Sequence, residues 1–219
     1  MVPPYATTYI APGNDAFAPP SAAGSKVNIF GKKVYPTLNN TSTGWTADYA
    51  PLAQVKTVKD ANGFQIGAAN PLLAAVYGSN VPAPGAMKQN GMTRILEISD
   101  GTSNTTLYSE AAGRTMQYYA NRSPVAYDAT SITGPIWADS DNRLTVTGTD
   151  PTGTTNIGTG PCVMNCNNLQ GDIYSFHTGG ANIAFADGSV RFVSQSINIV
   201  TLAALVTKSC GEVVDPTQY

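Results

Sequence analysis

The stretch from residue 182 to residue 193 constrains the fold of this chain more than any other. Its sequence is NIAFADGSVRFV, in which apolar and polar side chains alternate on both sides of Asp187-Gly188. Asp-Gly between two alternating runs is typical of a β-hairpin with a type I′ turn, which needs positive φ at both central positions. The pattern therefore predicts a hairpin. Its core-facing side chains are predicted to be Ile183, Phe185, Val190 and Phe192.

A short amphipathic helix is predicted directly after the hairpin. Its apolar residues follow the i, i+3, i+4, i+7 spacing that places side chains on one helix face. These residues are Ile199, Leu202, Ala203 and Val206. Lys208 lies near the end where a helix carries negative partial charge, and Gly211 suits the chain reversal beyond it.

Weaker signals predict the other regular elements. Thr93 is expected to cap a short helix that ends near Gly101, with Ile95 and Ile98 on one face. The remaining predictions are a strand pair within 27–35, helical turns at 70–78, and strands at 105–110 and 143–147. Together these elements predict an α+β fold built on an antiparallel sheet.

The bulk composition favours a single domain over residues 1–219. Its parts would include an extended, loop-rich region at 1–45 and a large loop-rich insertion at 116–160.

Only 12% of residues are charged, about half of the usual share. The net charge is −2 and no run of Lys or Arg occurs, which argues against nucleic acid and against a polybasic membrane patch. No stretch approaches the roughly 20 apolar residues that span a bilayer.

His177 is the only histidine, so its role bears directly on whether the protein is an enzyme. A general base needs a nucleophile or a substrate proton within reach, and a group that orients it. The sequence contains no G-x-S-x-G and no H-E-x-x-H motif. We therefore predict no catalytic residue and a structural His177 that donates to a backbone carbonyl near Gly179-Gly180. A hydrolase that uses His177 as a base is the alternative.

Three cysteines allow two kinds of site. Cys162 and Cys166 are separated by three residues, and a local disulfide between them needs only an oxidising compartment. Alternatively, both could join His177 and Cys210 in a Cys₃His zinc site. The disulfide is our prediction, and Cys210 is expected to be a buried free thiol.

Two polar clusters could bind an ion. Asp139 and Asp141 alternate in WADSDN as in part of a calcium loop, but the full pattern is missing, so a solvated turn is expected. No cofactor is predicted. The run Asp100-Gly101-Thr102-Ser103-Asn104 is interpreted as a helix end that continues into a turn. Glu110 is expected to form an ion pair with Arg114 or Arg94.

Two segments carry a family resemblance. They are ILEISDGTSNTTLYSE and FHTGGANIAFADGSVRFVSQSI, the second with nine residues between its His and its Asp-Gly. Both resemble the pre-pilin-like H-x9-DG family, a domain of unknown function abundant in planctomycete-type bacteria, and GPCVMNC resembles that family's approach to the second segment. The resemblance marks as signature residues Asp100, Gly101, Thr102, Ser103, Asn104, Glu110, His177, Gly179, Gly180, Asp187 and Gly188.

The resemblance implies a pseudopilin-like fold, in which a long N-terminal helix packs on an antiparallel sheet. These 219 residues do not contain that helix. We therefore expect membrane attachment and self-assembly, or contact with cell-surface partners, only in a form that carries it. The expected function is that of a non-enzymatic structural or adhesive protein outside the cytoplasm, at the cell surface or secreted.

The alternative function is a ligand-binding module for carbohydrate or another solute. Aromatic side chains would then form a stacking platform, although they could equally belong to the core. The candidates are Trp45, Trp137, Tyr118 and Tyr119.

Overall fold

The computed structural model describes residues 47–55, 57–59, 65–68, 70–77, 84–88, 91–114, 117–125, 142–154, 158–169 and 172–219. Several predictions fall outside these residues. They concern the region 1–45 with its strand pair at 27–35, Trp45, Trp137, Asp139 and Asp141.

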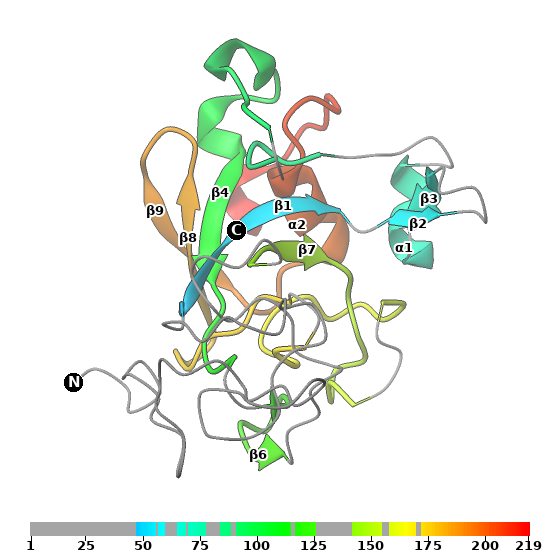
Figure 1. Ribbon diagram of the computed structural model, residues 1–219, viewed down its shortest axis with the longest axis vertical. Coiled ribbons are helices and arrows are strands. Elements are labelled where there is room, and N and C mark those ends of the chain that lie inside the picture. Colours follow the sequence, from blue (N-terminus) through cyan, green and yellow to red (C-terminus); the bar gives the residue numbers. More distant parts are fainter. Residues whose placement is uncertain are drawn as a thin grey trace, which may run out of the picture.

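A five-stranded sheet forms the centre of the described structure (Figure 1), in the order β7-β1-β4-β8-β9. Its strands are β1 (Tyr49–Val55), β4 (Thr106–Glu110), β7 (Leu144–Val146), β8 (Gly180–Phe185) and β9 (Val190–Ser194). The α+β class is confirmed, as are the strands predicted near 105–110 and 143–147. The prediction of an antiparallel sheet is wrong for one pair, because β1 and β7 run parallel. A long connection joins them in sequence, and such a crossover is what parallel pairing requires.

Smaller elements surround the sheet. They are β2 (Thr57–Lys59), β3 (Gln65–Ala68), α1 (Pro71–Tyr77), β5 (Gln117–Tyr118), β6 (Pro124–Val125), and the 3-10 turns η1 (Ile95–Glu97), η2 (Thr102–Asn104) and η3 (Pro216–Gln218). The turns predicted at 70–78 are confirmed as α1. Buried Asn70 fixes this helix, since its side chain accepts from the Leu72 amide and donates to the carbonyls of Thr147 and Gly160.

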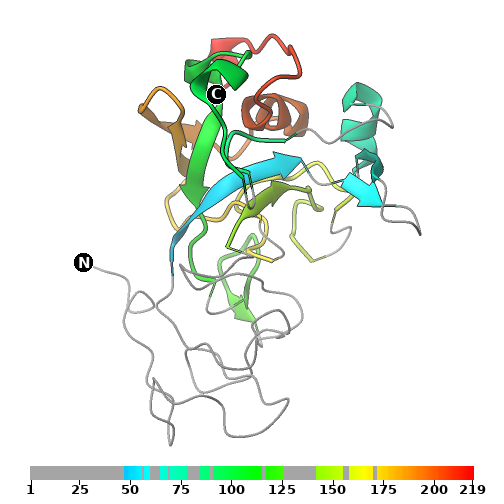
Figure 2. The same cartoon turned by 45° about the horizontal axis from the view of Figure 1, so that its top comes forward.

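One face of the sheet is covered by α2 (Ile199–Val206), which contacts β1, β4 and β7 (Figure 2). The predicted helix is confirmed, and Asn198 caps it by accepting from the Val200 amide at 2.8 Å. Burial extends beyond the predicted stripe to Thr201, Ala204 and Leu205. Val214 and Tyr219 also pack against the core. Within the described residues no helix is long and apolar enough to cross a membrane.

The hairpin forms where it was predicted, but its turn is one residue longer. The Gly188 amide donates to the Phe185 carbonyl, and Gly188 alone has positive φ, whereas Asp187 does not. Three residues therefore form the loop, with a left-handed glycine at its end, in place of a type I′ turn.

That extra residue shifts the pairing register. Val190 lies opposite Ala184 and Phe192 lies opposite Asn182. A one-residue shift moves every side chain of a strand to the other face. The predicted core positions of Ile183 and Phe185 are confirmed, whereas those of Val190 and Phe192 are wrong: these two are 65% and 52% exposed, and Val193 is buried in their place.

The helix predicted to start at Thr93 is also wrong. Only η1 forms, its N-cap is Arg94, and no side chain caps it. Glu97 is bonded to Lys208, so its carboxylate faces the protein, and Ile98 is partly buried. Ile95 and Leu96 consequently point into solvent, 75% and 96% exposed.

Candidate functional site

The predicted signature residues lie in two segments, 100–110 and 177–188, which pair along β4 and β8. These strands are antiparallel, with Tyr108 opposite Ala184 and Ser109 opposite Ile183. The start of one segment therefore meets the end of the other, and contacts at both ends of the strand pair join them.

At one end, the Glu110 carboxylate holds the second segment. Its Oε2 accepts from the Asn182 backbone amide at 2.7 Å, and its Oε1 lies 3.1 Å from Nε2 of His177. The Glu110 side chain is 8% exposed and that of His177 is 60% exposed. The Asn182 side-chain amide also donates to Oε1. A carboxylate thus replaces a backbone carbonyl as the acceptor at this end of β8.

Two predictions about this pair are corrected. His177 was expected to donate to a carbonyl beside Gly179-Gly180, and Glu110 was expected to pair with Arg114 or Arg94. In the structure, Glu110 and His177 are partners of each other. Glu110, at the end of β4, lies beside the start of β8, just after His177 in the chain. The sequence separation of the two residues does not reveal this contact. The His177 carbonyl in turn accepts from Nη2 of Arg122 at 2.8 Å.

At the other end, backbone groups join the two segments. The Asp187 amide donates to the Thr102 carbonyl at 3.1 Å, and the Ala186 amide donates to the Thr105 carbonyl at 2.8 Å. The Asp187 carboxylate accepts from the Ser189 amide and so closes its own turn. The turn of the hairpin is therefore anchored on the 3-10 turn η2.

Asp100 and Asn104 connect the first segment to the C-terminal part of the chain. The two carboxylate oxygens of Asp100 accept from the amides of Cys210 and Gly211, each at 2.9 Å. Asn104 accepts from the Tyr219 hydroxyl at 3.1 Å. These bonds hold the loop that follows α2.

Glycine is favoured at positions 179 and 180 of the second segment for two different structural reasons. Gly179 has a φ of 87° with open space around it, so its conformation favours glycine. A Cβ on Gly180 would collide with the Val193 carbonyl and approach the Phe192 ring at 3.0 Å. Gly180 is therefore required by the close approach of β9.

Comparison with known proteins places the chain in a family. The model of a family described as "Protein of unknown function (DUF1559)" matches residues 15–199, which include both segments. The chain belongs to this family. No curated protein and no solved structure matches it.

The DUF1559 chain holds one more cluster at the hairpin that sequence reasoning missed. The Arg191 guanidinium lies 4.3 Å from the centre of the Phe185 ring and donates to the Tyr219 hydroxyl. The same side chain approaches the Asp187 carboxylate at 3.7 Å. The cation–π contact could not be inferred from sequence, because the predicted register placed Arg191 on the outer face.

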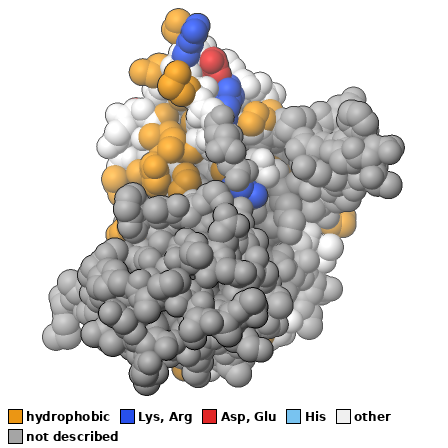
Figure 3. All heavy atoms as spheres, viewed as in Figure 1, with side chains coloured by type: hydrophobic (Ala, Val, Ile, Leu, Met, Phe, Trp, Pro, Cys, Tyr) orange, Lys and Arg blue, Asp and Glu red, His pale blue; other side chains and the backbone are white. Residues whose placement is uncertain are grey.

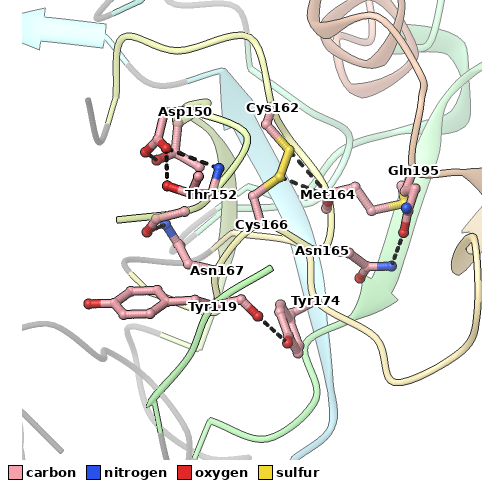
Figure 4. The surroundings of a disulfide bond; sticks show 12 residues. Tyr119, Asp150, Thr152, Cys162, Met164, Asn165, Cys166, Asn167, Tyr174 and Gln195 are labelled. Carbon is pink, nitrogen blue, oxygen red and sulfur yellow. Dashed lines mark hydrogen bonds between the residues drawn. A yellow bond between two sulfur atoms is a disulfide. The ribbon is translucent and has the colours of Figure 1, made fainter. Parts of the chain in front are cut away.

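The disulfide between Cys162 and Cys166 is present as predicted (Figure 4). Oxidised sulfurs are not thiolate ligands, so this pair does not form the alternative zinc site. Among the described residues, no group of three or more His, Cys, Asp or Glu side chains is placed to hold a metal ion. Cys210 is free but exposed, which corrects the prediction of a buried thiol, because it lies in the loop beyond α2.

Three asparagines around the disulfide connect separate loops, and their role was not predicted. Asn165 accepts from the Ser175 amide and donates to the Gly180 carbonyl and to Gln195 (Figure 4). Asn167 donates to the Gly153 carbonyl, and Asn168 accepts from the Tyr118 amide. The available signal was the sequence NCNN, since asparagine is favoured where backbone groups need a side-chain partner.

The described residues of the predicted aromatic platform, Tyr118 and Tyr119, differ in how far they are buried. Tyr118 is 7% exposed and packs against Tyr174 and Phe176, with ring centres 6.1 and 5.0 Å away, so it belongs to the core. Burial raises the pKa of Tyr174 to about 12. Tyr119 is half-buried, and its hydroxyl accepts from Gln117. The strongly exposed aromatic residues instead include Tyr49 and Phe192 on the outer face of the sheet.

Proposed function

We propose that this DUF1559 chain is a non-enzymatic, pseudopilin-like structural or adhesive protein that acts outside the cytoplasm, at the cell surface or secreted. The observation that carries the proposal is the pairing of residues 100–110 with residues 177–188 at both ends of β4 and β8. A catalytic acid or base must reach a substrate proton. Here Asp100, Glu110 and Asp187 accept from the chain's own backbone amides.

Two further features support an extracytoplasmic location. The Cys162–Cys166 disulfide is of a kind that persists in oxidising compartments and is rare in the cytosol. The low share of charged residues also suits an exterior whose polarity comes from Thr, Ser and Asn. Assembly at the membrane would take place in a form that carries the N-terminal helix expected from the family resemblance.

The location is tested in native cells by fractionation, surface proteolysis and mass spectrometry. We expect the protein in the envelope or extracellular fraction, with Cys162 and Cys166 oxidised and an N-methylated apolar residue upstream of residue 1. Recovery in the cytosol with both thiols reduced would contradict the proposal. Turnover of a substrate by the purified chain that is lost in a folded His177→Ala variant would favour the hydrolase instead.

A ligand-binding module is the second candidate, and the outer face of the sheet favours it. Tyr49 and Tyr108 are 58% and 41% exposed there, and β1–β4 pairing places them on the same face. Aromatic rings of this kind can stack on the C–H faces of sugars or on flat apolar ligands. A glycan that raises the melting temperature of the wild type but not of Tyr108→Ala would support this role. Leu72→Ala, at an exposed apolar position on α1, is the matched control.

A further inference from the structure

The two outward apolar side chains of β9, Val190 and Phe192, lie on an apolar face that extends across the sheet. Val190 lies opposite Ala184, which lies opposite Tyr108, which lies opposite Pro51. Figure 3 shows apolar side chains gathered over this part of the molecule. Since α2 covers the other face, the longer hairpin turn has moved Val190 and Phe192 from the core to an open surface.

The backbone of β9 is also open along one edge. Hydrogen-bonded pairs alternate along an antiparallel ladder. The Gln195 amide donates to Gly179 and the Phe185 amide donates to Ser189, so the bonded positions of β9 are odd-numbered. The amides of Val190 and Phe192 therefore point away from β8, and no described residue bonds to them. In the sheet formed by the described residues, β9 is the last strand.

Within the described parts of the chain, the usual protections of a sheet edge are missing on this side of β9. Natural edges are commonly blocked by charged side chains, by proline or by a covering element. The only charged residue of β9 is Arg191. Its guanidinium is held over the Phe185 ring on the inner face and does not project along the outer one. Val190, Phe192 and Ser194 thus leave an uncharged edge.

We propose that β9 pairs antiparallel with β9 of a second copy of this chain, about a two-fold axis at Phe192. Phe192 then lies opposite Phe192 of the other copy, and Val190 lies opposite Ser194, so no like charges meet. The pairing also brings the acidic Asp187 turn of each copy towards the end of the other sheet where Arg122 bonds to His177. This inference rests on the proposed structural role and names its partner as a second copy.

The first test is sedimentation velocity of the full chain over a range of concentrations. We expect a concentration-dependent dimer in the wild type and loss of that dimer in Phe192→Lys and Phe192→Pro. Proline removes the outward amide of residue 192 together with the phenyl ring, and leaves the bonds to β8 in place. Leu96→Lys, at an apolar and more exposed position away from β9, should keep the dimer. Circular dichroism and melting temperature establish that each variant is folded.

The second test is disulfide trapping, which reports the register. In a Cys210→Ser background, Phe192→Cys should form a linked dimer under mild oxidation, because opposed strand positions lie within disulfide distance. Val190→Cys alone should link poorly, and Val190→Cys with Ser194→Cys should link well.

Two outcomes would overturn the proposal. One is a folded wild type that stays monomeric at every concentration. This result counts against the proposal even if another segment or protein protects the Phe192 amide from hydrogen exchange. The other is a dimer that survives both substitutions at Phe192. Neither outcome alters the cell fractionation result, so failure of this contact is distinguishable from failure of the proposed surface role.

Discussion

The carboxylate of Glu110 and the imidazole of His177 lie 3.1 Å apart and join two segments that are distant in sequence. The two side chains differ in environment, since Glu110 is buried and His177 is largely exposed. Glu110 also accepts from the Asn182 amide at the end of the β4–β8 ladder. The carboxylate is therefore the structural half of the pair, and the imidazole contributes less.

This difference predicts unequal effects of substitution. Glu110→Ala should lower the free energy of unfolding by about 1–3 kcal/mol, because it removes the acceptor of the partly buried Asn182 amide. His177→Ala should lower it by less than about 1 kcal/mol, the usual value of an exposed ion pair. Urea denaturation measures both, and Glu110→Gln is the control that keeps an acceptor for Asn182. Equal losses in Glu110→Ala and His177→Ala would refute this assignment.

The glycines of the second segment provide a separate prediction. Gly188 has a φ of 86° and open space, so Gly188→Ala should lower stability by about 1–2 kcal/mol through backbone strain alone. Gly180→Ala places a methyl group against the Val193 carbonyl and should destabilise the hairpin more strongly. Thermal melts of the two variants check the order. A Gly180→Ala variant as stable as Gly188→Ala would show that β9 does not approach β8 as described.

The disulfide should contribute modestly, because it closes a very short loop. Cys162 and Cys166 are four positions apart, and the chain-entropy relation gives about 2 kcal/mol for a loop of this size. The double variant Cys162→Ala/Cys166→Ala should therefore unfold at a lower urea concentration than the oxidised wild type. Reductant should destabilise the wild type and leave the double variant unchanged. A response of the double variant to reductant would contradict this account.

The hydrogen bonds of Glu97 predict that the stability of the protein falls at acid pH. Hydrogen bonds from Lys208 and then Lys88 lower its pKa from the usual 4.5 to about 2. A carboxyl whose pKa is depressed in the folded state contributes stability above its unfolded pKa and loses it as the pH falls through the folded pKa. The stability difference between wild type and Glu97→Gln should thus be full above about pH 4.5 and shrink towards pH 2.

Urea denaturation of both proteins between pH 7 and pH 2 measures this difference. Lys208 is the more important partner, because its side chain is 8% exposed whereas that of Lys88 is 33% exposed. In a Lys208→Met background, the effect of Glu97→Gln should be reduced. A difference that stays constant down to pH 2 would exclude the ion pair as its cause.

The local elements were predictable where one short pattern decides them. The spacing of Ile199, Leu202, Ala203 and Val206 specifies α2, because a helix repeats its face at these positions. Asp187-Gly188 locates the hairpin, because this pair is favoured in short turns between strands. The short spacing of Cys162 and Cys166 identifies the disulfide. By contrast, the bonds of Asn165 reach Gly180 and Gln195, and no local rule selects partners at such separations.

The sequence by itself determined that a hairpin turns at Asp187-Gly188, that a helix follows it and that the chain is of the α+β class. Only the tertiary structure decided which faces these elements bury. Asp-Gly is compatible with loops of two or three residues, and the difference of one residue sends Val190 and Phe192 outwards. Likewise, only the pairing of β4 with β8 brings Glu110 to His177. Turn chemistry is local, whereas strand register and side-chain partners depend on contacts between segments distant in the chain.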